Sequence, residues 1–231
     1  MFTVKSDNNN LTKNFNSSTC KYSVLFDGLT IETTVTNEAH IVEEWIRLIS
    51  SIHDGKRTVV GLDTEWMRDQ NNKMKVAILQ LCVEDKCLIL QLSFMDNIPQ
   101  SLRTFLFDSN FEFVGVGILL DIKKLKNEYD LECNNGTDVA TVARTQCPGR
   151  FSSLGLKYLA KELADLDMKK SKEICTSKWE SKELTQDQIE YACIDAYASY
   201  KIGKKLLIEE KLLKEQKLLS ENQEATSILF C

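Results

Sequence analysis

Proline and histidine are scarce in this chain, and long apolar runs are missing from it. The 231 residues include two prolines, nine glycines and two histidines. With so few chain-breaking residues no linker divides the chain, and its length predicts one domain of ordinary size. No apolar run approaches the roughly 20 residues of a membrane-spanning helix, and residues 1–10 lack the apolar centre of a secretory signal. We therefore expect an intracellular protein without a membrane anchor, in the nucleus, the cytoplasm or both.

Cysteine pairs of the metal-binding kind are also missing. Eight cysteines are scattered along the chain without a C-x-x-C pair, and the two histidines are His40 and His53. The ligand spacing of a zinc site is therefore absent. In a reducing compartment these cysteines are expected to be free thiols, most of them small core residues.

An excess of positive charge is lacking as well. The formal net charge of −5 argues against binding nucleic acid through bulk basicity. A local basic rim is still compatible with this charge, since short lysine-rich clusters occur at 68–75, 123–126 and 169–172. Any nucleic-acid binding is therefore expected to be weak, non-processive and centred on one cleft.

The order of the predicted elements indicates an α/β fold with a mixed sheet. Apolar and β-branched runs predict strands at 22–26, 29–35, 58–62, 76–83, 87–92, 111–116 and, as a short one, 131–133. Helical spacing predicts helices from a cap at Thr36 or Asn37 to about residue 54, and at 99–107, 118–129, 138–145, 153–164 and 186–217. Asp27-Gly28 lies between the first two strands and is a strong hairpin signal. Strands first, followed by strands alternating with helices, are typical of an α/β sandwich.

The ends of the chain differ in composition from its centre. Residues 1–20 are rich in Asn and Ser, which predicts a disordered arm. The domain is expected to span 21–217, with a flexible tail at 218–231. Leucine pairs between 206 and 219 follow helical spacing, but they are too few to sustain a coiled coil; they predict a last helix packed on its own sheet or a contact in a homo-oligomer.

Two carboxylates stand at the end of the strand predicted at 58–62. Asp63 and Glu65 are two residues apart, so in an extended strand both side chains point to the same face. Adjacent acids repel one another unless a cation lies between them. The pair is therefore a candidate divalent-metal site, although such a pair on an exposed strand edge is more often merely solvated.

Two further acids occur in settings that suit a metal site. Asp121 lies in a strongly apolar helix start, where a carboxylate is costly unless it is paired or bound to metal; an acid stabilised by the helix dipole is the alternative. Thr185 and Gln188 form a capping box that begins a long helix. On that helix Tyr191 and Asp195 are four residues apart and share a face. The alternative interpretation is that Tyr191 is an aromatic core residue and Asp195 a surface acid.

Together these segments resemble the DEDD, or DnaQ-like, 3′–5′ exonucleases with a tyrosine in the third motif. The three motifs are Gly61–Trp66, Gly115–Leu125 and Leu184–Ala196. The likeness extends to Lys75–Cys82, Thr137–Ala140, Ser153–Ala160 and Trp179, which resemble Werner-type exonuclease domains, and it covers about 58–208. The resemblance implies a ribonuclease H-like fold: a mixed sheet of about five to six strands flanked by helices, with an extra N-terminal hairpin.

The resemblance also implies a mechanism. Asp63, Glu65, Asp121 and Asp195 would ligate two Mg²⁺ or Mn²⁺ ions, with Asp63 bridging both. One ion would activate water and the other would stabilise the leaving 3′ oxygen. Tyr191 would hydrogen-bond the attacking water, and Thr64 and Trp66 would contact the terminal nucleotide. Asp138, at a helix start, is better explained as a cap.

The implied activity removes nucleoside 5′-monophosphates from the 3′ end of single-stranded or 3′-recessed nucleic acid. No motif chooses between DNA and RNA, because that choice depends on contacts to the 2′-hydroxyl. A catalytically inactive nucleic-acid-binding scaffold with the same fold is the alternative. The presence of all five expected side chains argues against it.

Overall fold

The fold is built on one mixed β-sheet. The structure is a computed structural model that describes residues 11–16, 19–53, 55–169 and 171–209. The strands are β1 (Leu11–Asn16), β2 (Thr19–Phe26), β3 (Leu29–Thr36), β4 (Thr58–Arg68), β5 (Met74–Val83), β6 (Lys86–Leu90), β7 (Phe111–Gly115) and β8 (Gly136–Asp138). They form a single sheet in the order β1-β2-β3-β6-β5-β4-β7-β8.

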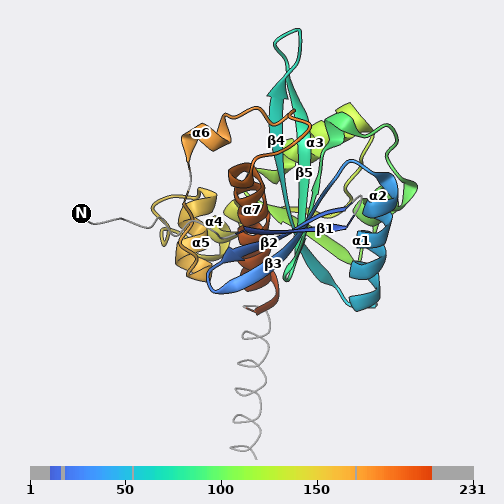
Figure 1. Cartoon of the computed structure of the whole chain (residues 1–231). Helices are drawn as coiled ribbons and strands as arrows, with labels where there is room; N and C mark the ends of the chain where they lie inside the picture. The colour runs from blue at the N-terminus through green and yellow to red at the C-terminus, as the bar shows by residue number, and fades with distance from the viewer. Residues whose placement is uncertain (1–10, 17–18, 54, 170, 210–231) are drawn as a thin grey trace, which may run out of the picture.

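Helices cover both faces of this sheet. They are α1 (Ala39–Ile52), α2 (Gln100–Phe107), α3 (Ile118–Tyr129), α4 (Val139–Gln146), α5 (Leu156–Ala164), α6 (Lys172–Cys175) and α7 (Gln186–Lys204), and a π turn at Lys205–Glu209 follows α7. The helices α4, α5 and α7 pack on one face, and α1, α2 and α3 pack on the other (Figure 1). The predicted α/β class is therefore confirmed.

Two local predictions are confirmed by the backbone, the hairpin turn at Asp27-Gly28 and the capping box of Thr185 and Gln188. Asp27 and Gly28 both have positive φ angles, 52° and 74°, and form the turn between antiparallel β2 and β3. The strands β4, β5 and β6 form an antiparallel meander. The Thr185 side chain accepts a hydrogen bond from the Gln188 main chain and the Gln188 side chain accepts one in return, which completes the capping box of α7. Turn and cap residues act locally, so the sequence alone specifies these features.

The edges of the sheet differ from the prediction. Leu11–Asn16, within the expected arm, forms β1 and pairs along its length with β2. The last strand lies at Gly136–Asp138 rather than 131–133, and it pairs in parallel with β7. Edge strands of this kind are held mainly by hydrogen bonds between main chains. A polar or very short segment can form such a strand without the alternating apolar pattern by which strands are predicted from sequence. The expected sheet of five to six strands is thereby extended to eight, because β3 of the N-terminal hairpin also joins it through β6.

The start of α1 also differs from the prediction. Glu38 is the N-cap, and its carbonyl accepts hydrogen bonds from the main chain of Ile41 and Val42. The predicted cap Thr36 instead accepts a hydrogen bond from the Glu38 main-chain N–H at 2.9 Å. A threonine hydroxyl can accept a hydrogen bond from a main-chain N–H in a turn as well as in a helix cap. The sequence around Thr36 is therefore compatible with a helix that begins at Thr36 and with one that begins two residues later.

Alternation along the strands divides the core into two layers. Val59 and Ile78 belong to the layer beneath α7, whereas Val60 and Leu79 belong to the layer beneath α1 and α2. The six cysteines whose side chains the structure describes are free thiols, as expected.

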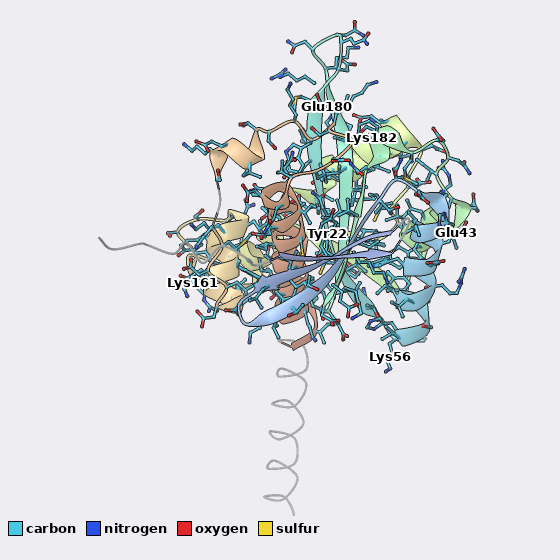
Figure 2. All side chains as sticks on the ribbon, viewed as in Figure 1. Tyr22, Glu43, Lys56, Lys161, Glu180 and Lys182 are labelled. Atoms are coloured by element: carbon cyan, nitrogen blue, oxygen red, sulfur yellow. The ribbon has the colours of Figure 1, made fainter. Side chains whose placement is uncertain are left out.

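Charged side chains extend from the surface of the domain (Figure 2): Glu43 from α1, Lys161 from α5 and Lys56 from the connection between α1 and β4. Among the described residues, no helix is both long enough and apolar enough to cross a membrane. Residues 1–10 of the predicted arm, 210–217 of the last predicted helix and the predicted tail 218–231 lie outside the described residues.

Candidate active site

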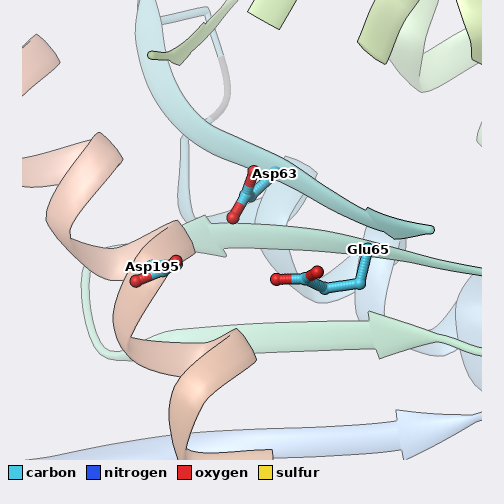
Figure 3. Close-up of side chains that lie close together, drawn as sticks. All are labelled: Asp63, Glu65 and Asp195. Carbon is cyan, nitrogen blue, oxygen red and sulfur yellow. The ribbon is translucent and has the colours of Figure 1, made fainter. Parts of the chain in front are cut away.

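Three carboxylates meet where α7 crosses β4. Asp63 and Glu65 come from β4 and Asp195 from α7, and one oxygen from each lies within 4.8 Å of the others. Figure 3 shows the three side chains turned toward a common space between the strand and the helix. The structure thus brings together three of the four acids predicted to bind metal.

The close approach of α7 depends on Gly61. A Cβ atom at Gly61 would lie 2.0 Å from the main-chain oxygen of Ala196 and 2.6 Å from the main-chain nitrogen of Tyr200. Because any side chain at this position would displace the helix, glycine lets Asp195 lie against the strand that carries Asp63, two residues further on. The alternation of β4 then places Glu65 on the same face.

The chemistry of the group suits a hard divalent cation. Carboxylate oxygens are the ligands that Mg²⁺ and Mn²⁺ prefer in proteins. Asp195 is only 3% exposed, so water screens its charge poorly, and three negative charges within 4.8 Å repel one another unless a cation is bound. The donor set and its charge therefore fit a divalent-metal site.

Tyr191 lies one helical turn before Asp195. Its ring packs on Trp179 with the centroids 6.0 Å apart. Burial raises the pKa of its hydroxyl, and so do the negative charge of Asp195 and a hydrogen bond with Cys175. The hydroxyl therefore stays protonated at neutral pH and is suited to donate a hydrogen bond rather than to act as a base.

Asp121 lies outside the group of three carboxylates. It is 8% exposed at the start of α3, and its Oδ1 accepts a hydrogen bond of 2.5 Å from the Thr64 hydroxyl. Burial raises the pKa of Asp121 to about 6, against the hydrogen bonds and the nearby Lys124 ammonium, which lower it. A buried carboxylate with a raised pKa gains from a bound cation, so its metal-binding role stays a prediction compatible with its position.

The two residues predicted to contact substrate form a relay to Asp121. The Trp66 indole N–H donates to the Thr64 hydroxyl at 2.7 Å, and that hydroxyl donates to Asp121. Lys124 lies over the Trp66 ring, 4.8 Å from its centroid. Contact with the terminal nucleotide stays a prediction for both residues. The structure adds a second role, the support of Asp121, which a motif cannot reveal because α3 and β4 are far apart in sequence.

Asp138 and Cys175 interact with the elements that carry Asp121 and Tyr191. Asp138 caps α4 by accepting hydrogen bonds from the main chain of Ala140 and Thr141, as predicted for this acid. The Tyr191 hydroxyl interacts with Cys175, at the end of α6, and this interaction helps to raise the pKa of the hydroxyl. Sequence reasoning treated Cys175 only as one of eight thiols, and no local pattern marks the contact, because α6 and α7 are brought together by the fold.

A pocket of about 460 Å³ opens beside Tyr191 and Asp195. Its walls come from the tip of the β2–β3 hairpin, the segment leading into α6 and one face of α7. Among the described residues that line it, most ionisable side chains are acidic, namely Asp27, Asp167, Glu173, Asp187, Glu190 and Asp195, and Lys169 is basic. Such a wall repels phosphate groups, so this side of the site is a poor path for a nucleic-acid backbone.

Comparison with known proteins identifies this arrangement. A family model described as 3′–5′ exonuclease matches residues 33–210, which include the three clustered carboxylates, Asp121 and Tyr191. The chain belongs to the 3′–5′ exonuclease family. The predicted resemblance to DnaQ-like exonucleases is therefore confirmed.

Individual members of the exonuclease family support the assignment. The chain is 35% identical over 153 residues to the bifunctional 3′–5′ exonuclease/ATP-dependent helicase WRN of Mus musculus, covering 64% of this chain and 11% of that protein. It is 33% identical over 150 residues to a 3′–5′ exonuclease of Arabidopsis thaliana, covering 64% and 52%. The chain therefore spans about half or less of the length of these relatives.

Solved structures show the same fold. Escherichia coli RNase D matches with a TM-score of 0.61 and 19% identity, over 78% of this chain and 48% of that one. The catalytic core of RRP6 from Trypanosoma brucei matches with a TM-score of 0.60 and 16% identity, over 83% and 50%. The predicted ribonuclease H-like fold of this exonuclease domain is confirmed.

Proposed function

We propose that this exonuclease domain removes nucleoside 5′-monophosphates one at a time from the 3′ end of DNA, RNA or both. The observation that carries the proposal is the meeting of Asp63, Glu65 and Asp195 within 4.8 Å, in a fold that matches the 3′–5′ exonuclease family. In the reaction, the oxygen of water bonds to the phosphorus of the last phosphodiester while the bond from that phosphorus to the 3′ oxygen breaks. The leaving 3′ oxygen takes up one proton and becomes the 3′-hydroxyl of the shortened strand, and the hydroxyl group from water becomes part of the 5′-phosphate of the released nucleotide.

The chain supplies the ligands and the hydrogen bonds for this hydrolysis. Asp63, Glu65 and Asp195 would hold two Mg²⁺ or Mn²⁺ ions together with Asp121. Such ions supply the positive charge that makes water nucleophilic and stabilises the leaving oxygen. The protonated Tyr191 hydroxyl orients the attacking water from the α7 side. Thr64 and Trp66 hold Asp121 in place through their relay.

A degradation time course tests the proposal. The substrates are 5′-labelled single-stranded DNA, 3′-recessed duplex DNA and single-stranded RNA of one sequence, each with Mg²⁺, Mn²⁺ or EDTA. We expect a ladder that shortens from the 3′ end and needs the metal, and the fastest substrate names the class. Binding without any ladder on all three substrates would contradict the proposal and indicate the inactive scaffold.

Tyr191→Phe is expected to lower kcat by about 10- to 100-fold and to leave Mn²⁺ affinity within twofold. The phenyl ring keeps its packing on Trp179, so the loss reports the hydroxyl alone. Single-turnover kinetics and calorimetric titration with Mn²⁺ separate the two effects. Tyr197→Phe is the matched control, since Tyr197 is buried on the same helix and packs on Phe26. Equal kcat in wild type and Tyr191→Phe would limit Tyr191 to packing.

Thr64→Val is expected to move the acid limb of the pH–rate profile upward by about 0.5–1 unit. The pKa of Asp121 is raised from 3.8 to about 6 in the fold. Folding therefore favours the protonated form of Asp121. The protonated carboxyl group contributes to the stability of the fold below about pH 4, and this contribution is lost as the pH rises through about 6. A metal ligand must be deprotonated, so activity falls as pH drops through that range. The Thr64 hydrogen bond lowers this pKa, and its removal raises the pKa further.

The profile of Thr64→Val is measured as kcat/KM at subsaturating Mg²⁺ between pH 5 and 8. Thr58→Val is the matched control, because Thr58 is buried on the same strand and its hydroxyl donates to the main-chain oxygen of Lys56. An acid limb that shifts equally in both variants, or in neither, would refute the link between Thr64 and Asp121.

A further inference from the structure

Gln80 is a buried amide without a hydrogen-bond partner. It lies in the middle of β5 and is 0% exposed. Within the part of the chain that the structure describes, neither its amide nitrogen nor its amide oxygen has a partner. Buried side-chain amides are nearly always hydrogen-bonded, because an unpaired one has lost its bonds to water. An apolar residue of the same length would stabilise the strand better, so the fold alone does not explain a glutamine here.

The register of the sheet places Gln80 beside the metal site. Gln80 is paired directly with Asp63 across β4 and β5, so both side chains lie on the face that α7 covers. The Cβ atoms of directly opposed residues are about 4.5–5.5 Å apart, a gap that an aspartate and a glutamine can span together. Its other lateral neighbour on that face, across β6, is the apolar Ile89. Asp63 is therefore the lateral neighbour with which the amide can form a hydrogen bond.

We propose that Gln80 is a positioning residue. Its amide N–H groups, unpaired among the residues that the structure describes, would donate to the Asp63 carboxylate when metal is bound and hold it in its metal-binding orientation. This inference rests on the proposed function, in which Asp63 would help to hold two cations. A carboxylate that ligates a cation must present its oxygens in a fixed direction, and hydrogen bonds from residues behind a metal ligand commonly fix it. The amide has two N–H donors and carries no charge, so it orients Asp63 without competing with the cations for its charge.

The test compares Gln80→Met with Gln91→Met. Gln91 is also buried, but its amide donates to the main-chain oxygens of Ser181 and Lys182 at 3.0 and 3.1 Å. In EDTA, Gln80→Met should raise Tm by about 2–4 °C, since an unpaired amide is removed; Gln91→Met should lower Tm. In calorimetric titration with Mn²⁺, Gln80→Met should bind about 10- to 100-fold more weakly, whereas Gln91→Met should bind within twofold of wild type.

Each result decides the assignment. A higher Tm together with weaker Mn²⁺ binding supports the positioning role, because a merely structural glutamine cannot produce that combination. Wild-type Mn²⁺ affinity in Gln80→Met, or a lower Tm in EDTA, overturns the role of Gln80 alone. If Gln80→Met does not fold, Gln80→Leu takes its place under the same criteria. A wild-type protein that binds no Mn²⁺ would overturn the metal site itself and this assignment with it.

Discussion

Asp63→Asn is expected to reduce 3′–5′ degradation by at least about 10³-fold while raising the unfolding temperature of the protein in EDTA. The activity falls because Asp63 is the predicted bridge between both cations. The stability rises because one of three carboxylates within 4.8 Å loses its charge. At an effective dielectric constant of about 20, two charges about 5 Å apart repel by about 3 kcal/mol. Asp63 is partly exposed, so solvent screening leaves about half of this or less.

The opposite directions of the two effects make the Asp63 prediction specific. A variant that loses activity because it misfolds would show a lower unfolding temperature instead. Asp96→Asn is the matched control, since Asp96 is exposed and lies outside the group of clustered carboxylates; the substitution removes one negative charge and should change neither property. Near wild-type turnover in Asp63→Asn would show that the metal site is wrongly assigned. At the same high Mn²⁺ concentration, the wild type should gain more thermal stability than Asp63→Asn. The variant is expected to bind the ion more weakly, and a ligand stabilises the folded state more when its concentration exceeds Kd by a larger factor.

The parts of the site that the sequence could predict share a local geometry. Asp63 and Glu65 are related by the two-residue repeat of a strand, and Tyr191 and Asp195 by the four-residue spacing of a helix. These periods decide which face a side chain occupies before any tertiary contact forms. The family motifs then bring the two segments to one site, and the structure confirms that the strand pair and Asp195 meet.

The contacts that could not be predicted all cross between elements. The hydrogen bond from Thr64 to Asp121 depends on how α3 packs against β4, and the approach of Cys175 to Tyr191 depends on the path from α6 to α7. The pairing of Gln80 with Asp63 requires the register of β5. A shift of one residue would have turned Gln80 toward the other core. The amino-acid pattern restricts such registers, but the packed sheet selects one of them.

Gly61→Ala is expected to destabilise the domain by about 3 kcal/mol or more, at the upper end of the effects of overpacking. The added methyl group would lie 2.0 Å from the main-chain oxygen of Ala196. Because that atom belongs to the backbone of α7, relief requires movement of the whole helix rather than of one side chain. Urea unfolding followed by circular dichroism measures the loss. Gly203→Ala is the comparison, since its methyl group would meet the Val114 side chain and alanine favours a helix by about 1 kcal/mol.

Gly61→Ala should also impair catalysis where it remains folded. Asp195 precedes Ala196 on α7, so displacement of the helix draws this carboxylate away from Asp63. At a temperature at which both variants are folded, Gly61→Ala should require about tenfold more Mn²⁺ for half-maximal activity, and Gly203→Ala should require the wild-type concentration. Equal stability and equal metal requirement in the two variants would mean that the Gly61 contact does not set the distance between helix and strand. The metal site would then owe its geometry to the carboxylates themselves, and α7 would follow the cations rather than position them.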